Sequence, residues 1–328
     1  MKKYLVLTIV FMLIFVLSST SIGANEAKTI IRLSTTFGEE HIDTKIAREF
    51  KDLVEGMTDK IEVQVFPNCQ LGSEDEIPQQ IASNSLEMQA DGFMILDAYA
   101  NEYGYFDSCY VWNSYNHWLN AWNGEIGEAA RQLLAKRANA VYLGVYYVGA
   151  RHTTANKPLV KVEDFQGLKI RVPMIPAWVD TWKGVGANPI PISLTELFMA
   201  LQTGTAEASE GPPGQILTYK LYEVQDYYIL TSHAIQAGDL VISKIFFEAL
   251  DPELQKILKE AGSKACEWGT KKSIEIEQLQ INELEAKGMK IIIPDVKALK
   301  EKAIPSLKTL FERDWTTSSL KQISTFAK

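Results

Sequence analysis

Two arginines, Arg151 and Arg171, each follow a short apolar segment in a part of the chain that is otherwise rich in acidic and aromatic residues. A guanidinium group presents planar, paired N–H donors that match the two oxygens of a carboxylate. If the two side chains meet at neighbouring strand ends, they can hold one organic anion between them. The residue types therefore raise the hypothesis of an anion clamp.

The segments around these arginines decide whether they can meet. In residues 168–172 apolar side chains alternate with polar ones, so Arg171 is expected to point away from the core-facing residues of a short strand that Pro173 ends. Arg151 follows an apolar, aromatic run at residues 141–148. Alternation alone also allows an alternative, in which both arginines are solvated at the edges of a sheet.

The first 24 residues have the layout of a secretory signal peptide. Lys2 and Lys3 precede an apolar run at residues 4–17, and small residues continue to Ala24. We expect cleavage near Ala24 and a periplasmic mature protein, with an uncleaved N-terminal anchor as the alternative. No cysteine lies near the cleavage point, so we expect no lipid attachment.

Composition excludes several classes of protein. The formal net charge of −8 argues against a nucleic-acid partner. The three cysteines are widely spaced and odd in number, so at most one disulfide can form within the chain, and both a disulfide scaffold and a cysteine zinc site are excluded. The length of 328 residues favours two domains.

Strands that alternate with helical patterns predict an α/β fold. Residues 29–66 read as strand, helix and strand, Ser73 reads as the N-cap of the next helix, and residues 88–95 read as a buried strand. The aromatic residues at 97–122 are expected to pack a loop-rich core rather than to line a pocket. Residues 251–287 keep helical spacing, and one helix of that length would reach roughly 50 Å, enough to brace two domains.

Catalytic and metal-binding signatures are absent from the sequence. We find no paired-histidine zinc motif, no nucleophile elbow, no phosphate-binding loop and no dinucleotide fingerprint, and the four histidines never fall at ligand spacing. We therefore expect no metal and no cofactor. His152, beside Arg151, is the histidine that could touch a ligand. Asp91, Glu74 and Glu210 are candidate acids or bases, with solvated or capping roles as the alternative.

Six segments resemble, in the same order, the C4-dicarboxylate-binding (DctP-type) subunits of tripartite ATP-independent periplasmic (TRAP) transporters. The resemblance covers essentially the whole mature chain. Each segment is weakly diagnostic alone, and their common order makes the resemblance specific. The segments are 65–74 (VFPNCQLGSE), 151–158 (RHTTANKP), 168–173 (LKIRVP), 186–191 (GANPIP), 196–202 (ELFMALQ) and 232–233 (SH).

This resemblance implies a two-lobed periplasmic binding protein of the class II type, with two mostly parallel sheets flanked by helices and a long helix that bridges the lobes. Lobe one is expected at residues 25–148 and 237–276, and lobe two at residues 149–236 and 277–328. Such a protein closes about a hinge on a small organic acid and delivers it to the membrane permease subunits. We expect it to be a monomer.

The resemblance also implies roles for single residues. Arg171 makes the paired salt bridge to the ligand carboxylate, and Arg151 supports it from the neighbouring strand. The family commonly has an asparagine that reaches the same carboxylate where this chain has Gly211. A backbone group, a water molecule or Glu210 is then expected to take its place, and the identity of the acid stays open.

Further ligand contacts are expected around this clamp. Leu194 stands where an aromatic side chain often packs on the ligand in the family, and Trp178 is expected to supply that surface instead. The remaining candidates come from the other lobe or from the neighbourhood of Arg151, and they are Phe37, Asp91, Glu74 and His152.

Two other functions are compatible with the residues. One is a secreted enzyme, such as a lyase acting on acidic sugars, with Glu210 or Asp91 as the base and the arginines neutralising a carboxylate. The other is a ligand-sensing subunit that reports to a membrane receptor. For a binding protein, the predicted cleft suits a sugar acid, an aromatic acid or a keto acid.

Overall fold

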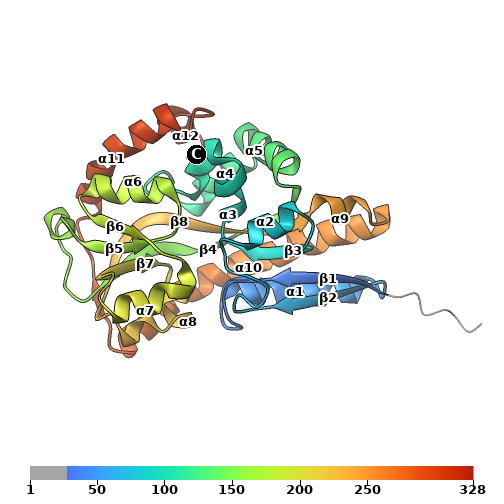
Figure 1. The fold of residues 1–328 in the computed structure, drawn as a ribbon, viewed down its shortest axis with the longest axis horizontal. Helices are drawn as coiled ribbons and strands as arrows, with labels where there is room; N and C mark the ends of the chain where they lie inside the picture. The colour runs from blue at the N-terminus through green and yellow to red at the C-terminus, as the bar shows by residue number, and fades with distance from the viewer. Residues whose placement is uncertain (1–27, 328) are drawn as a thin grey trace, which may run out of the picture.

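The computed structural model describes residues 28–327, so the predicted signal peptide lies outside the described residues. A mixed sheet runs through the centre of the molecule, with helices on both sides (Figure 1). Its strands are β1 (Thr29–Ser34), β2 (Ile61–Phe66), β3 (Met88–Asp91), β4 (Ala140–Ala155), β5 (Lys169–Val172), β6 (Asn188–Pro191), β7 (Ala208–Gly211), β8 (Tyr227–Ser243) and β9 (Lys290–Ile292).

The strands form one sheet in the order β2-β1-β3-β8-β4-β7-β5-β6, with β9 paired to β8. Parallel pairs lie at both ends (β1 with β2 and β3; β5 with β6 and β7), whereas β4 and β8 are antiparallel to each other. The α/β fold is as predicted, but the two expected sheets are continuous. The cause is the length of β4 and β8, which have 16 and 17 residues. Paired with each other, they are long enough to pair also with strands from both ends of the sheet, so the two ends are joined into one sheet.

Three register shifts interrupt the pairing of β4 with β8, and the first two are β-bulges with one extra residue on β4. The register shifts between Tyr142 and Gly144, between Tyr147 and Gly149, and again just after Arg151. A bulge bends its strand, increases the twist and re-aims the neighbouring side chain. The long strands therefore change direction near the middle of the sheet, which lets its two ends face each other.

The helices cover both faces of the sheet. Figure 1 shows α6 and α11 on one side of the β5–β6–β7 end, and α7 and α8 on the other. The α-helices are α1 (Ile42–Met57), α2 (Ile77–Ala82), α3 (Met94–Tyr99), α4 (Tyr115–Trp122), α5 (Glu125–Arg137), α6 (Pro176–Val185), α7 (Leu197–Gln202), α8 (Pro213–Thr218), α9 (Lys244–Glu248), α10 (Pro252–Ala286), α11 (Val296–Arg313) and α12 (Leu320–Ser324). Short 3₁₀ helices are η1 (Asn101–Asp107), η2 (Val162–Phe165), η3 (Leu194–Glu196) and η4 (Leu221–Glu223).

The predicted long helix is confirmed as α10, a continuous helix of 35 residues. It packs against α1, β4 and α8, so it spans the sheet from end to end. Gly269, in the middle of α10, is buried where α1 crosses, and a side chain there would collide with Ile46. The glycine thus allows two helices to approach closely, and the helix continues through it.

Two local predictions were wrong. The helix expected to start at Ser73 starts at Ile77, because residues 73–76 form a turn in which the Glu76 carboxylate accepts hydrogen bonds from the Ser73 amide and hydroxyl. The strand expected at residues 88–95 ends at Asp91, and its apolar continuation forms helix α3. A short apolar run fits a buried strand or a buried helix equally well, and here the break at Gly92 separates the two.

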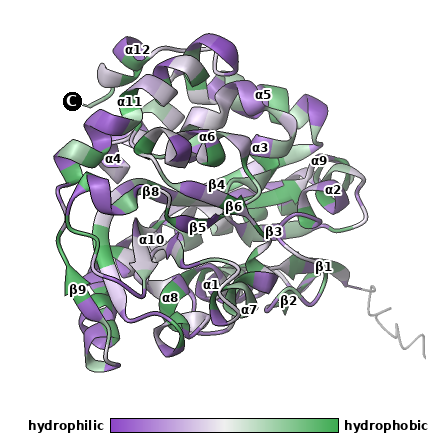
Figure 2. Cartoon of the chain, turned by 60° about the vertical axis from the view of Figure 1, so that its left-hand side comes forward, coloured by the Kyte–Doolittle hydropathy of each residue, from purple (hydrophilic) through white to green (hydrophobic). Residues whose placement is uncertain are grey.

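The aromatic segment at residues 97–122 packs a core, as predicted. Its largest rings are buried and stack on one another or meet edge to face, among them Tyr105, Phe106, Trp112, Trp118 and Trp122. A second core lies between α1, the β1–β2–β3 end of the sheet and α10. Hydrophobic and hydrophilic stretches alternate along the outer helices (Figure 2), as expected for elements that bury one face.

Within residues 28–327 no helix combines the length and the apolar character needed to cross a membrane. The three cysteines are free thiols: Cys109 and Cys266 are buried, and Cys69 is half-buried.

Candidate functional site

Arg171 lies in β5 between the parallel neighbours β6 and β7, one residue before the strand ends. Only 1% of its surface is exposed, so the alternative of a solvated edge arginine is wrong for this residue. Its Nε donates a hydrogen bond of 2.7 Å to the carbonyl oxygen of Ile192. That bond fixes the direction of the guanidinium group.

The free end of the Arg171 guanidinium lacks a hydrogen-bond acceptor among the described residues. Its Nη2 is buried without a partner, and the nearest carboxylate oxygen, Oε1 of Glu74, lies 3.6 Å away. Burial lowers the pKa of Arg171, with Glu74 opposing the effect, but a guanidinium keeps its proton at any physiological pH. A buried positive charge with unused donors favours an anion.

Arg151 lies in β4 at the third register shift, and it is also buried. Its Nε donates to Oε2 of Glu210 at 2.6 Å and its Nη2 donates to Oε1 at 2.7 Å, which makes a paired salt bridge. Its Nη1 donates to Oε1 of Gln236 at 2.7 Å. Glu210 therefore holds the paired donors of Arg151, and it is Arg171 that keeps donors unused.

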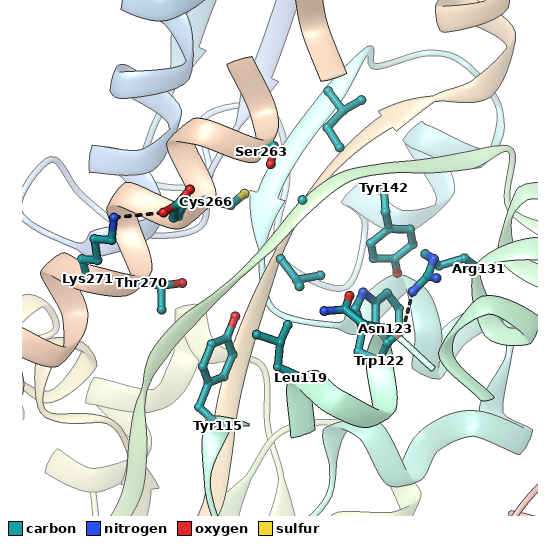
Figure 3. A pocket seen from close by; sticks show the side chains of 14 residues that line it. Tyr115, Leu119, Trp122, Asn123, Arg131, Tyr142, Ser263, Cys266, Thr270 and Lys271 are labelled. Carbon is teal, nitrogen blue, oxygen red and sulfur yellow. Dashed lines mark hydrogen bonds and ion pairs between the residues drawn. The ribbon is translucent and has the colours of Figure 1, made fainter. Parts of the chain in front are cut away.

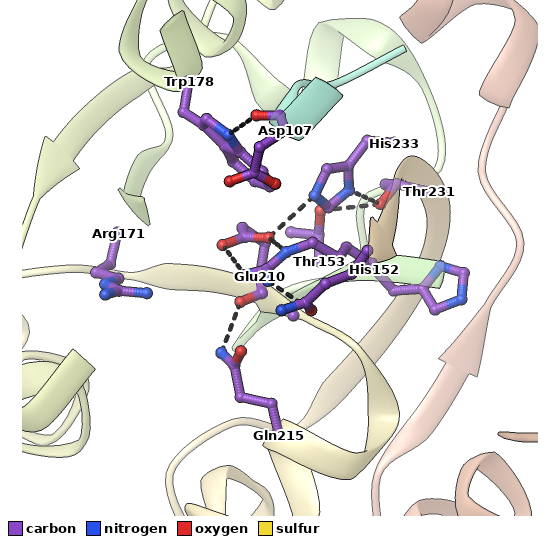
Figure 4. Close-up of polar contacts among 12 residues, drawn as sticks. Asp107, His152, Thr153, Arg171, Trp178, Glu210, Gln215, Thr231 and His233 are labelled. Carbon is purple, nitrogen blue, oxygen red and sulfur yellow. Dashed lines mark hydrogen bonds and ion pairs between the residues drawn. The ribbon is translucent and has the colours of Figure 1, made fainter. Parts of the chain in front are cut away.

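The Arg151–Glu210 pair is held by aromatic and imidazole groups (Figure 4). The Trp178 ring centroid lies 4.9 Å from Cζ of Arg151, within range of a cation–π contact, and Nε1 of Trp178 donates to the backbone oxygen of Asp107. His233 donates from Nε2 to Glu210 at 3.1 Å. Burial lowers the pKa of His233, so its ring is neutral and carries its proton on Nε2, facing the carboxylate. Burial alone would raise the pKa of Glu210, but Arg151 and His233 outweigh it and lower the pKa to about 2.

The two arginines line one enclosed cavity of about 40 Å³ between the two ends of the sheet. It brings together six of the residues predicted from the sequence, namely Arg171, Arg151, Trp178, Asp91, Phe37 and Glu74. These six residues are spread between positions 37 and 178, so the fold assembles the site from segments far apart in sequence.

Carboxyl groups form part of the cavity wall. Asp91 accepts hydrogen bonds from the Thr36 hydroxyl and the Gly92 amide, and Glu74 accepts one from the Leu194 amide at 3.2 Å. Burial raises the pKa of both acids, and nearby carboxylates add to the effect. Even so, no group of three or more metal-ligating side chains within residues 28–327 is arranged to hold a metal ion.

Phe37 closes one side of the cavity. Its ring stacks on His41 at a centroid distance of 3.8 Å and meets Tyr219 edge to face at 5.7 Å. Phe37 follows β1, whereas Tyr219 follows α8, so this contact joins the two ends of the sheet across the cavity.

Three predicted residues lie behind the cavity and do not line it. Glu210 faces Arg151 and His233, and Gly211 ends β7 in register with His152. His152 accepts a hydrogen bond at Nδ1 from the Ser232 amide, its ring packs edge-on against Tyr228, and burial lowers its pKa to about 3. His152 is thus a neutral core residue.

Three polar lining residues were missed at the sequence level: Asp107, Gln215 and Gln236. Asp107 stood out as an acid within an aromatic segment, and that signal could have found it. Gln215 stood in the first turn of a helix directly after the Gly211 loop. Gln236 offered no signal, because its position depends on pairing with Gly149 at a bulge.

A larger pocket of about 490 Å³ lies elsewhere, between α4, β4 and α10 (Figure 3). Its two cations are already paired, since Arg131 donates to Glu128 and to the Trp122 carbonyl, and Lys271 donates to Glu267. None of the predicted site residues lines it. This pocket is the larger of the two, but the smaller cavity around Arg171 has the unused donors that a ligand-binding site for an anion needs.

Comparison with known proteins identifies the class of protein to which this chain belongs. Residues 33–314 match the family described as "Bacterial extracellular solute-binding protein, family 7" (DctP), and the chain belongs to that family. It is a two-lobed α/β solute-binding protein, and the members of this family are binding proteins rather than enzymes.

Individual relatives match over nearly their full lengths. The sialic acid-binding periplasmic protein SiaP of Vibrio cholerae is 26% identical over 296 residues, 90% of this chain and 92% of the relative. The 2,3-diketo-L-gulonate-binding periplasmic protein YiaO of Escherichia coli is 26% identical and covers 92% and 93%. A TRAP binding protein from Roseobacter denitrificans, solved with bound 3-deoxy-D-manno-oct-2-ulosonic acid, is 27% identical with a TM-score of 0.84, covering 91% of this chain and 99% of that one.

Proposed function

We propose that this protein is the extracytoplasmic solute-binding subunit of a TRAP transporter, and that it captures a small organic acid and delivers it to the membrane permease. The single observation that carries the proposal is Arg171, a fully buried guanidinium whose Nη2 lacks a hydrogen-bond partner among the described residues and lines a cavity. A ligand carboxylate supplies the missing acceptors and the missing charge.

The surrounding residues take distinct roles in this proposal. Arg151 is paired with Glu210, which neutralises its charge, so it positions Trp178 rather than holding the ligand by its paired donors. Trp178 offers an apolar wall. Phe37 and Asp91 contribute from the opposite side of the cavity.

Capture requires the cleft to open. Small-molecule sites typically measure roughly 300–1,000 Å³, whereas this cavity measures about 40 Å³. We propose that residues 25–148 with 237–276, and residues 149–236 with 277–328, form the two lobes. The contacts that must then separate include Glu74 with the Leu194 amide, Phe37 with Tyr219, and Trp178 with the Asp107 carbonyl.

Secretion is part of the same proposal. The layout of residues 1–24 suits a cleavable signal peptide, and the matched relatives are named periplasmic proteins. We infer that the mature protein works in the periplasm as a monomer.

A thermal-shift screen of the mature protein against a panel of sugar acids, keto acids, aromatic acids and dicarboxylates tests the function. A ligand that binds only the folded state stabilises it by about 2.7 kcal/mol at a concentration one hundred times its Kd. We expect at least one acid to raise the melting temperature and to be recovered unchanged. Absence of any shift across the panel contradicts the proposal, and turnover of the acid would favour an enzyme.

A further inference from the structure

Gly211 and Gln215 share one space beside the cavity. A Cβ atom built on Gly211 would lie 2.6 Å from Nε2 and 2.7 Å from Cδ of Gln215, closer than side chains tolerate. The backbone of Gly211 does not require glycine, because its φ angle is not in the left-handed region. The absence of a side chain at Gly211 therefore leaves room for the Gln215 side chain in its present position.

Gln215 is built into the site rather than left at its surface. Only 2% of the residue is exposed, and it lines the same cavity as Arg171. It lies in the first turn of α8, two residues after Pro213, and its backbone N–H donates to the Pro212 carbonyl at 3.0 Å. Two prolines restrict the backbone here, so the side chain leaves from a fixed point.

The side-chain amide of Gln215 has unused capacity. Among the described residues it makes one hydrogen bond, from Nε2 to the carbonyl oxygen of Glu210 at 3.2 Å (Figure 4). An amide group has two N–H donors and an oxygen with two lone pairs, so one N–H and the oxygen remain for a ligand.

This amide differs in kind from the arginine in the same cavity. The guanidinium of Arg171 only donates, which suits a carboxylate, whereas a group that donates and accepts suits a hydroxyl. The carboxyl groups of Glu74, Asp91 and Asp107 line the cavity as well, and their oxygens are further acceptors for hydroxyl groups. The wall is therefore better matched to an acid that carries hydroxyls than to one that carries only methylenes.

We propose that Gln215 is a specificity-determining residue that reads the hydroxyl group on the carbon next to the ligand carboxylate, so that the site selects 2-hydroxy sugar acids over their 2-deoxy analogues. The proposal rests on the proposed function, because Arg171 must hold the carboxylate for Gln215 to reach its neighbour. The proposal explains why this chain has glycine at position 211, where a side chain would displace the Gln215 amide.

Titration calorimetry with two matched pairs of acids tests the assignment: D-gluconate against 2-deoxy-D-gluconate, and D-galactonate against 2-deoxy-D-galactonate. In at least one pair we expect the unaltered protein to bind the 2-hydroxy acid about tenfold more tightly. Gln215→Ala removes this preference, weakening the 2-hydroxy acid about tenfold while the 2-deoxy acid changes less than twofold. Gln132→Ala, which removes an exposed glutamine from α5, leaves both affinities unchanged.

A double-mutant cycle separates a ligand contact from a packing role. Gly211→Ala pushes the Gln215 amide aside and should cost about tenfold in affinity for the 2-hydroxy acid. In the Gln215→Ala background the same change should cost less than twofold, because the space is then empty. Additive losses, or equal losses for both members of a pair, overturn the inference.

The outcome also distinguishes this inference from the proposed function. If other acids in the panel bind through Arg171 while neither matched pair shows a preference for the 2-hydroxy acid, the reading of Gln215 is wrong and the binding function stands. If no acid binds, both are wrong.

Discussion

The buried pair of Arg151 and Glu210 makes a quantitative prediction. The pKa of Glu210 lies at about 2 in the folded protein against an ordinary value of 4.5, chiefly because Arg151 and His233 outweigh the effect of burial. A difference of this size corresponds to about 3 kcal/mol of stability. Glu210→Gln keeps the shape but removes the charge, so we expect the free energy of unfolding to fall by about 3 kcal/mol at pH 7.

The sign of the pH dependence follows from the lowered pKa. The contribution of Glu210 is fully present above pH 4.5, and it is lost as the pH falls toward 2. Urea unfolding of the unaltered protein and of Glu210→Gln should therefore differ by about 3 kcal/mol at pH 7 and converge on acidification. Glu207→Gln changes an exposed residue immediately before β7, so it serves as the control and should be neutral. A difference below 1 kcal/mol at pH 7, or one that does not shrink in acid, would refute the reasoning.

Two further predictions concern the cavity wall and the thiols. Glu74→Gln removes a negative charge 3.6 Å from Arg171 and keeps an amide oxygen as acceptor, so calorimetry should find a carboxylate bound several-fold more tightly; weaker binding would contradict a competing role for Glu74. A thiol reagent should titrate at most Cys69 in the native protein, and slowly, because burial raises its pKa to about 11, whereas denaturation should release Cys109 and Cys266 as well. Fewer than three thiols after denaturation would contradict three free cysteines.

Periodic patterns predicted the elements of this fold well. Alternation around Arg171 and helical spacing along residues 252–286 correctly gave β5 and α10, because each depends on one period over a single segment. The number of sheets could not be predicted in the same way. Strands β4 and β8 contain glycines and bulges that break a simple alternation, and only their mutual pairing reveals one continuous sheet.

The residues of the candidate site were likewise predictable from the sequence only in part. Nine site residues were predicted from the sequence, and the fold brings six of them to one cavity. The sequence did not predict that Glu210 would occupy the paired donors of Arg151. Alternation placed Arg171 on the face away from the core and left open that it is a solvated arginine, whereas the structure buries Arg171 as well as Ile170 and Val172 on the opposite face. Burial on both faces is a tertiary property, and a four-residue strand carries no signal for it.

Calorimetry tests the role of Arg171 as the ligand anchor. The affinity for the acid that gives the largest thermal shift is compared between the unaltered protein, Arg171→Lys and Arg171→Ala. Loss of a buried, paired contact to a carboxylate costs about 3 kcal/mol or more, so we expect Arg171→Ala to bind at least about 100-fold more weakly. Arg171→Lys should also bind poorly, since a point charge cannot replace the paired donors. Unchanged affinity in Arg171→Ala, in a protein that still melts cooperatively, would show that Arg171 does not hold the ligand carboxylate.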